Sequence, residues 1–264
     1  MENTENWLIT GATSGFGRLV AQRALDRGAH VIAVGRRGDL LAGLTGRVTP
    51  ITLDITAPET EETLRDAIEA AGGLDVLVNN AGYGVFGAVE QISGAEARAL
   101  FDTNVLANLA VLRAALPALR ASRGRVVQLS SMNGQIAWAS SGLYSASKAA
   151  VELLSEALAA EVAPAGVRVT LVEPGLFATG FAGSVHAVAP DETYAPTVGK
   201  FLSDFSQLPP SAFGDPARVA DAIVAVTEMP EPPLRLAVGE DAIAGIRASL
   251  QARLAELERN GLND

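Results

Sequence analysis

The hydrophobic residues of this chain alternate between short continuous runs and longer segments with a helical period. The runs are rich in Val, Ile and Leu, as expected for strands that are buried on both faces of a parallel sheet. Seven strands are predicted: Trp7–Thr10, His30–Gly35, Val48–Asp54, Leu74–Asn79, Arg125–Ser130, Val167–Glu173 and Leu234–Val238.

The segments between these runs carry alanine, leucine and charged residues at helical intervals. Helices are predicted over Gly15–Arg27, Pro58–Ala71, Ser93–Arg120, Gly142–Val162 and Pro216–Glu228, and a last one after Gly239. In Gly142–Val162, the residues Val151, Leu154, Leu158 and Val162 form a stripe that faces the core or a partner subunit. The alternation predicts an α/β protein of the Rossmann type, with a doubly wound seven-stranded parallel sheet and helices on both faces.

One segment departs from this alternation. From Leu176 to Asp215, Gly, Pro, Ser, Thr and aromatic residues are mixed without a sustained period, which is typical of a substrate lid. Its apolar side chains favour a hydrophobic substrate; they are Phe177, Phe181, Val185, Tyr194, Phe201 and Phe205. Because no repeat or linker divides the chain, residues 1–264 are expected to form a single dinucleotide-binding catalytic domain that contains the lid, 176–215.

Composition narrows the classes of function. With 264 residues and 48% hydrophobic content, the chain can bury one large core. A net charge of -10 disfavours nucleic acid and anionic membrane surfaces as partners. The chain has no cysteine, its start Met1–Asn6 is polar, and no segment contains about 18 uninterrupted apolar residues. We therefore expect a cytoplasmic protein, with neither a nucleic-acid nor a membrane partner.

No metal site is expected. The two histidines, His30 and His186, are far apart in the sequence, and no acidic cluster lies near either at ligand spacing.

A glycine-rich turn lies between the first predicted strand and the first predicted helix. Gly11, Gly15 and Gly17 allow a tight backbone that can approach a pyrophosphate, while the helix start offers unpaired N–H groups. Thr13, Ser14 and Phe16 complete the turn. Such a sequence also occurs in ordinary turns, but its position between a strand and a helix favours a dinucleotide site.

Two arginines follow the second predicted strand. Arg36 and Arg37 stand where an NAD-binding chain usually has a carboxylate for the ribose hydroxyl. A guanidinium group can bind a 2′-phosphate through two hydrogen bonds, so the pair, and Arg36 above all, favours NADP(H) over NAD(H). The alternative is a solvated basic loop.

Two further strand ends are candidates for cofactor contacts. Asp54 and Ile55 close the third strand, and Asp54 either accepts a hydrogen bond from an adenine amino group or caps the helix near Pro58. After the fourth strand, Asn80, Ala81 and Gly82 supply small residues at a point of close backbone approach.

Tyr144 and Lys148 are four residues apart in a predicted helix, so that phenol and ammonium lie on one face. A nearby cation is expected to lower the tyrosine pKa and to make it an efficient general acid. Ser130 and Ser131 end the fifth strand and point in opposite directions, so one of them can hold a substrate oxygen. Taken alone, a Tyr–Lys pair with this spacing is most often a surface pair.

Together, the turn at Gly11–Gly17, the Asn79–Gly82 segment, Ser131, the Tyr144–Lys148 segment and the Pro174–Gly175 pair resemble the short-chain dehydrogenase/reductase family. The resemblance implies that Asn104 supports a water relay to Lys148 and that Lys148 holds the nicotinamide ribose. Its spacing of thirteen residues before Tyr144 selects Ser131 over Ser130. It also implies that Pro174, Gly175 and Thr179 border the nicotinamide.

The function implied is that of an NADP(H)-dependent oxidoreductase, which moves hydride between nicotinamide and a small-molecule carbonyl or secondary alcohol, with Tyr144 as general acid/base. The resemblance also implies a homodimer or homotetramer that pairs through Ser93–Arg120 and Gly142–Val162. The alternative is a catalytically silent NADP-binding sensor or scaffold with the same fold.

Overall fold

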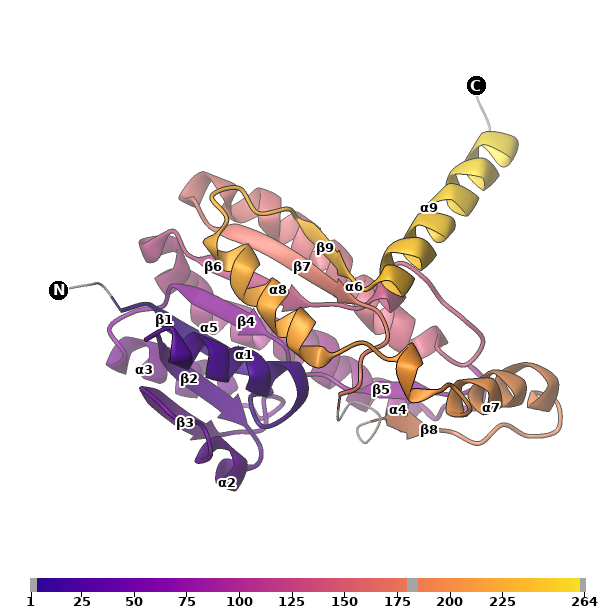
Figure 1. Ribbon diagram of the computed structural model, residues 1–264, viewed down its shortest axis with the longest axis horizontal. Coiled ribbons are helices and arrows are strands. Elements are labelled where there is room, and N and C mark those ends of the chain that lie inside the picture. The colour runs from indigo at the N-terminus through magenta and orange to yellow at the C-terminus, as the bar shows by residue number, and fades with distance from the viewer. Residues whose placement is uncertain (1–3, 180–184, 262–264) are drawn as a thin grey trace.

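A computed structural model describes residues 4–179 and 185–261, and within them the predicted parallel sheet is confirmed. All neighbours in the seven-stranded sheet are parallel, in the order β3-β2-β1-β4-β6-β7-β9 (Figure 1). The strands are β1 (Asn6–Thr10), β2 (His30–Gly35), β3 (Val48–Thr52), β4 (Val76–Asn79), β6 (Arg125–Leu129), β7 (Arg168–Pro174) and β9 (Arg235–Val238). The carboxyl ends of these strands therefore meet at one edge, which is where sheets of this kind bind ligands.

Helices cover both faces of the sheet (Figure 1). The main ones are α1 (Gly15–Asp26), α3 (Thr60–Ala70), α4 (Gly94–Phe101), α5 (Ala107–Ser122), α6 (Gly142–Val162) and α8 (Pro216–Glu228), whereas α9 (Glu240–Asn260) projects away from the sheet (Figure 1). Two short helices are α2 (Gly38–Leu41) and α7 (Lys200–Ser206). Side-chain hydrogen bonds fix where some of these helices begin. Ser93 caps α4, for example, because its hydroxyl accepts the Glu96 N–H at 3.2 Å and the Glu96 carboxylate accepts the Ser93 N–H at 2.7 Å.

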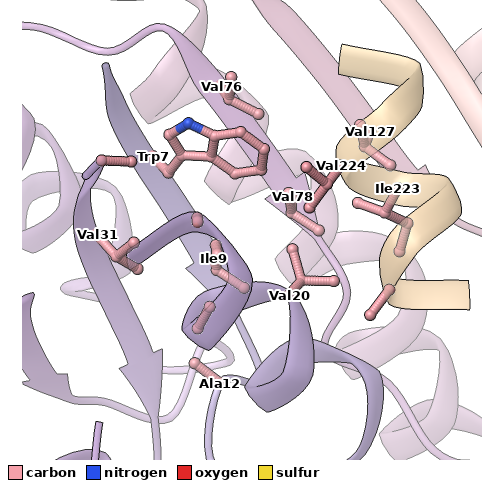
Figure 2. Close-up of a cluster of buried hydrophobic side chains, with 14 of the residues drawn as sticks. Trp7, Ile9, Ala12, Val20, Val31, Val76, Val78, Val127, Ile223 and Val224 are labelled. Carbon is pink, nitrogen blue, oxygen red and sulfur yellow. The ribbon is translucent and has the colours of Figure 1, made fainter. Parts of the chain in front are cut away.

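The core is divided between the two faces because successive strand residues point in opposite directions. Trp7 and Ile9 of β1 pack on one face with residues of α1 and α8, including Val20 and Ile223 (Figure 2). Leu8, between them in sequence, packs on the other face with α3, α5 and α6. Each fully buried side chain of this size contributes roughly 1.5–3 kcal/mol. These contacts hold the strand ends, and the residues that follow them, in fixed positions.

The structure differs from the predicted elements at several points. β3 ends at Thr52 rather than Asp54, because the chain turns at Asp54. The predicted helix Ser93–Arg120 is interrupted by a π-helical turn, η1 (Asp102–Leu106), between α4 and α5. A second sheet joins β5 (Gly84–Phe86) to β8 (Val185–Ala187), each only three residues long. Strands this short leave no periodic signal.

The segment predicted as an irregular lid contains regular structure. Besides β8, it includes a π-helical turn at Ala195–Gly199, helix α7 and a 3₁₀ turn at Pro210–Ala212. Phe181 of the predicted lid lies outside the described residues.

The helical run Gly94–Ser122 is long and apolar enough to cross a membrane by length and composition, and half of its most apolar part is buried. Core helices of soluble proteins share these properties. Here Val111, Ala115 and Leu119 pack in the core against residues of α3.

Candidate active site

The glycine-rich turn joins β1 to α1. Gly11 and Gly15 have left-handed backbones, with φ of 69° and 53°, which residues with a Cβ rarely adopt. A Cβ on Gly17 would lie 2.5 Å from the Gly11 carbonyl oxygen, so the turn tolerates no larger residue there. Ser14 precedes α1, and its side chain does not cap the helix. The first N–H groups of α1 are thus not used by that hydroxyl, and the tight turn fits a pyrophosphate.

Thr10 fixes this turn to the loop after β4. Its hydroxyl accepts the N–H groups of Asn80 at 2.9 Å and Ala81 at 3.0 Å, and the Asn80 amide donates to the Thr10 carbonyl at 2.8 Å. Asn80 and Ala81 are therefore held against the turn. The role of Thr10 was missed, although its position at the end of the first strand was a usable signal.

The two arginines after β2 are exposed beside the turn. The Arg37 guanidinium donates to the Thr13 hydroxyl at 3.4 Å. Arg36 is close enough to Asp54 to lower the pKa of that carboxyl. Both cations lie at the ligand-binding edge of the sheet, where a 2′-phosphate of a dinucleotide is expected.

Asp54 is held by the residues that follow it. One of its carboxylate oxygens accepts the Thr56 N–H at 3.0 Å and the Thr56 hydroxyl at 2.8 Å. The Thr56 N–H contributes most to lowering the pKa of Asp54, and Arg36 contributes less. Because α3 begins at Thr60 and its N-cap is Glu59, the alternative in which Asp54 caps that helix is wrong. Ile55, next to it, is buried.

Asn104 lies on the π-helical turn η1 and is buried. Its amide nitrogen donates to the Tyr83 carbonyl at 2.9 Å and to the Ser147 hydroxyl at 3.0 Å, and its amide oxygen accepts the Tyr83 N–H at 3.1 Å. Ser147 in turn donates to the Tyr144 carbonyl at 2.7 Å. A π turn often marks a functional position in a helix, and here it anchors the start of α6.

The side chain of Lys148 reaches from α6 to the end of β6. Its ammonium group donates to the Leu129 carbonyl at 2.8 Å. A Cβ on Gly82 would lie 3.0 Å from the Asn104 amide oxygen and 3.7 Å from the Lys148 Nζ. The absence of a side chain at Gly82 therefore leaves room directly beside the ammonium group.

Tyr144 is buried and hydrogen-bonded to Ser131. The Ser131 hydroxyl also accepts the Asn133 N–H at 3.2 Å, which fixes its direction. Ser130 points elsewhere, since a Cβ on Gly134 would lie 2.8 Å from the Ser130 hydroxyl. The structure thus places Ser131, and not Ser130, against Tyr144.

The pKa values of the pair differ from the sequence-based expectation. Burial raises the pKa of Tyr144 to about 12, and the hydrogen bond to Ser131 only partly opposes this. Burial lowers the pKa of Lys148 to about 8, against the opposing effect of Glu152. The expectation that Lys148 lowers the tyrosine pKa is wrong here, because the ammonium is bound to Leu129 and lies 6.0 Å from the centre of the tyrosine ring. Tyr144 is therefore protonated at neutral pH and able to donate its proton.

The chain after β7 returns to the glycine-rich turn. A Cβ on Gly15 would lie 3.8 Å from the Cβ of Thr179, and the rings of Phe16 and Phe177 meet edge to face at 5.9 Å. Pro174 ends β7, and Gly175 follows it. Thr179 and Phe177 therefore lie against the glycine-rich turn.

Asp241 was missed by sequence reasoning. This residue of α9 accepts the Leu176 N–H at 2.7 Å and so fixes the backbone directly after Gly175. The contact joins residues 65 positions apart, and no sequence pattern links them.

A row of aromatic rings leads away from the Ser131–Tyr144 segment. Trp138 stacks on Phe201 at 6.2 Å, Phe201 on Phe205 at 6.2 Å, and Phe205 meets Phe213 edge to face at 6.2 Å. Trp138 and Phe205 are exposed. Phe201 and Phe205 are two of the apolar lid residues named from the sequence. Trp138 and Phe213 were not among them.

The two histidines have local partners. The His30 ring bonds to Asn6 at 3.1 Å and to Thr49 at 2.9 Å, while His186 bonds to Glu96 at 2.6 Å. Within residues 4–179 and 185–261, no three His, Cys, Asp or Glu side chains are grouped as metal ligands.

Sequence comparison relates the chain to proteins of known family. Residues 5–189 match the family model for short chain dehydrogenases. The oxidoreductase BOA17 of Botryotinia fuckeliana is 36% identical over 248 residues, which cover 91% of this chain and 90% of the relative. A 3-ketodihydrosphingosine reductase of Bacteroides thetaiotaomicron is 35% identical over 237 residues, covering 88% and 87% of the two chains.

Solved structures of short-chain dehydrogenases also resemble this chain. A short-chain dehydrogenase from Streptomyces avermitilis has a TM-score of 0.90 and 40% identity, over 98% of this chain and 96% of that one. Another from Burkholderia cenocepacia, determined in complex with NADP, has a TM-score of 0.78 and 27% identity over 99% of both chains.

Proposed function

The chain belongs to the short-chain dehydrogenase family, and on this basis we propose that it is an NADP(H)-dependent oxidoreductase acting on a carbonyl or secondary alcohol. The observation that carries the proposal is the hydrogen bond between Ser131 and Tyr144, with Lys148 on the same helix beside Gly82. These groups combine an acid, a carbonyl-polarising hydroxyl and a cation within one buried site.

The side chains have distinct parts in the reduction of a carbonyl. The nicotinamide supplies the hydride when the cofactor is bound. The substrate oxygen accepts hydrogen bonds from the hydroxyl groups of Ser131 and Tyr144, and Tyr144 gives up its proton as negative charge develops there. Lys148, as a cation, holds the ribose of the cofactor. Asn104 holds the loop and helix start that border Lys148.

The arginines support NADP(H) as the cofactor. Arg36 and Arg37 offer two guanidinium groups at the end of β2, next to the uncapped start of α1. The related dehydrogenase from Burkholderia cenocepacia was solved with NADP. Asp54 and Ile55 are the proposed neighbours of the adenine.

We further propose that the substrate is hydrophobic. The row from Trp138 to Phe213 offers partly exposed aromatic surface adjoining the loop between Ser131 and Tyr144. The name of the Bacteroides thetaiotaomicron relative specifies a keto substrate, which supports a ketone with an apolar part.

Assembly and location are also proposals. Exposed leucines on the η1 and α6 surface, Leu106, Leu153 and Leu154, favour a homodimer or homotetramer that buries them. A chain without cysteine suits the reducing cytoplasm.

Substitution of Tyr144 by Phe tests the proposal. The variant keeps the ring but loses the proton donor, so reduction of a panel of apolar ketones with NADPH should fall by at least about 10²-fold. Binding of NADPH, followed by its fluorescence, should be retained. Full turnover in Tyr144→Phe would overturn the assignment. A wild-type protein that binds NADPH but reduces no carbonyl would favour the sensor or scaffold.

A further inference from the structure

Two buried glutamates lie behind the candidate active site. Glu152 follows Lys148 by one turn of α6 and is 3% exposed; Glu173, on β7 directly before Pro174, is 2% exposed. Neither belongs to the set of residues proposed to contact substrate or cofactor. They nevertheless connect the helix of Lys148 with the end of β7, which is expected to border the nicotinamide.

The surroundings of the pair contain too little positive charge for two ionised carboxyls. Arg235 of β9 donates to Glu152 at 2.9 Å and also to the half-exposed Glu156 at 2.5 Å. On the other side, the neutral amide of Gln135 donates to Glu173 at 2.9 Å. Among the described residues, Arg235 and Lys148, the latter one turn from Glu152, are the cations that act on these carboxyls. Two cations thus stand against three carboxyl groups, and burying an uncompensated charge is costly.

Two polar atoms in this cluster have no hydrogen-bond partner among the described residues. They are one carboxylate oxygen of Glu152 and the hydroxyl of Ser130. A Cβ on Gly134 would lie 3.2 Å from the first and 2.8 Å from the second, so both atoms converge on the same small space. The oxygen of Glu152 therefore needs a donor from within the cluster.

Glu173 can provide that donor only as an acid. The carboxyls of Glu152 and Glu173 lie within hydrogen-bonding reach of each other. Two carboxylates are acceptors only, so a bond between them requires one proton on the pair.

Other charged groups lie on the helices and strands that pack around Glu152 and Glu173. Lys148 and Glu156 lie on α6 with Glu152, and Arg235 lies on β9. Arg253 of α9 donates to the Gln135 carbonyl at 2.8 Å. Among these groups, Glu152 is the one that raises the pKa of Lys148, against the effect of burial.

We infer that Glu173 is held as an acid that donates its proton in a hydrogen bond to the Glu152 carboxylate, and that the negative charge of this carboxylate keeps Lys148 cationic beside Gly82. The pair are positioning residues, since they act through Lys148 and touch neither substrate nor cofactor. This second part of the inference rests on the proposed function.

The pKa of Glu173 is raised, as expected for a buried carboxyl that donates a hydrogen bond to Glu152. Burial and the neighbouring Glu152 raise it, Gln135 and Arg235 lower it, and the resulting pKa is about 7. The proton of Glu173 is therefore lost as the pH rises through neutrality. The pair then gains a second negative charge next to the site.

The effect on Lys148 is tested by the pH profile of kcat/KM for ketone reduction. The wild type should lose activity on the alkaline side near pH 8, where Lys148 loses its proton. Glu152→Gln removes the charge but keeps the shape, and should move this limb to lower pH by about one unit. Glu156→Gln is the matched control, since Glu156 also binds Arg235 but is half exposed, and should leave the limb in place. The role assigned to Glu152 would be overturned if the alkaline fall of kcat/KM in Glu152→Gln stayed at the wild-type pH. It would also be overturned if this fall moved equally in both variants.

The proton on Glu173 is tested without turnover. Infrared spectra of the wild type should show the carbonyl stretch of a buried protonated carboxyl at about pH 6, and this band should fade as the pH passes 7. Glu173→Gln should lack the band and Glu156→Gln should keep it. A wild type without the band would overturn the protonated state of Glu173, whatever its activity. A titrating band in a protein that reduces no carbonyl would leave the pair standing and contradict the proposed function.

Discussion

At the scale of single residues, burial sets the protonation states of the candidate catalytic side chains. Tyr144 retains its proton because it is buried, and its pKa of about 12 makes it a proton donor across the physiological range. The Tyr–Lys spacing predicted that the two side chains share a helix face, but the sign of the pKa change needed the fold. A four-residue spacing contains no information about the Leu129 carbonyl that binds Lys148.

Ser131→Ala should lower kcat by about 10²-fold to 10³-fold, because the hydroxyl proposed to polarise the substrate carbonyl is lost. Steady-state kinetics with NADPH and a reducible ketone measure the effect. Ser130→Ala is the matched control: this neighbouring hydroxyl is buried without a partner among the described residues and points away from Tyr144, so its loss should leave kcat near the wild-type value. Equal losses in both variants would contradict the assignment of Ser131.

Arg36→Ala should weaken NADPH binding by roughly 10-fold to 100-fold, as expected for the loss of a charged hydrogen-bonding group. NADH binding should stay unchanged, because NADH lacks the 2′-phosphate. Titration calorimetry with both cofactors measures the difference. Arg65→Ala, an exposed arginine on α3, serves as the control. If NADH and NADPH bound equally well to the wild type, the phosphate role of Arg36 would fail.

At the scale of elements, the sequence predicted the seven sheet strands because most are runs of β-branched and aliphatic residues; β1, β2 and β4 are almost wholly buried, whereas β3 and β9, at the two edges of the sheet, are more exposed. The π-helical turn at Asp102–Leu106 was not visible, since one inserted residue barely changes the apolar period of a long helix. The contacts of Asp241 with Leu176 and of Trp138 with Phe201 were also missed. They join segments distant in sequence and depend on how α7 and α9 pack.

The junction of β7 with α6 predicts a pH dependence of stability. The folded-state pKa of Glu173 is raised from 4.5 to about 7, so the folded protein binds more protons than the unfolded chain between these values. The contribution of Glu173 to the free energy of unfolding should therefore fall as the pH rises from 4.5 to about 7. Urea unfolding of Glu173→Gln across this range should show a smaller fall than the wild type. An identical slope would contradict the raised pKa.

At the scale of the whole molecule, the parallel sheet brings the ends of β1, β2, β4, β6 and β7 to one edge, where the glycine-rich turn, the arginines and the Ser131–Tyr144 pair lie. This arrangement was predictable because strand order and direction follow from the alternation of strands and helices. Helix α9 projects from the body (Figure 1), and its leucines Leu250, Leu254 and Leu257 are exposed.

The proposed assembly predicts different effects for two exposed leucines. Leu153 on α6 is 68% exposed and Leu254 on α9 is 55% exposed. Leu153→Asp should shift the mass measured by light scattering to that of the monomer, because a charge buried in an apolar interface is costly. Leu254→Asp should leave the mass unchanged. The reverse result would place the interface on α9.

The most direct test of the central claim is the transfer of the hydride itself. The protein is incubated with an apolar ketone and NADPH deuterated at the transferred position, and the alcohol is examined by mass spectrometry. The wild type should place one deuterium on the carbinol carbon with a single stereochemistry, and Tyr144→Phe should form almost no product while still binding NADPH. A protein that binds NADPH yet transfers no deuterium to any carbonyl, or a Tyr144→Phe variant that transfers it as fast as the wild type, would contradict this account.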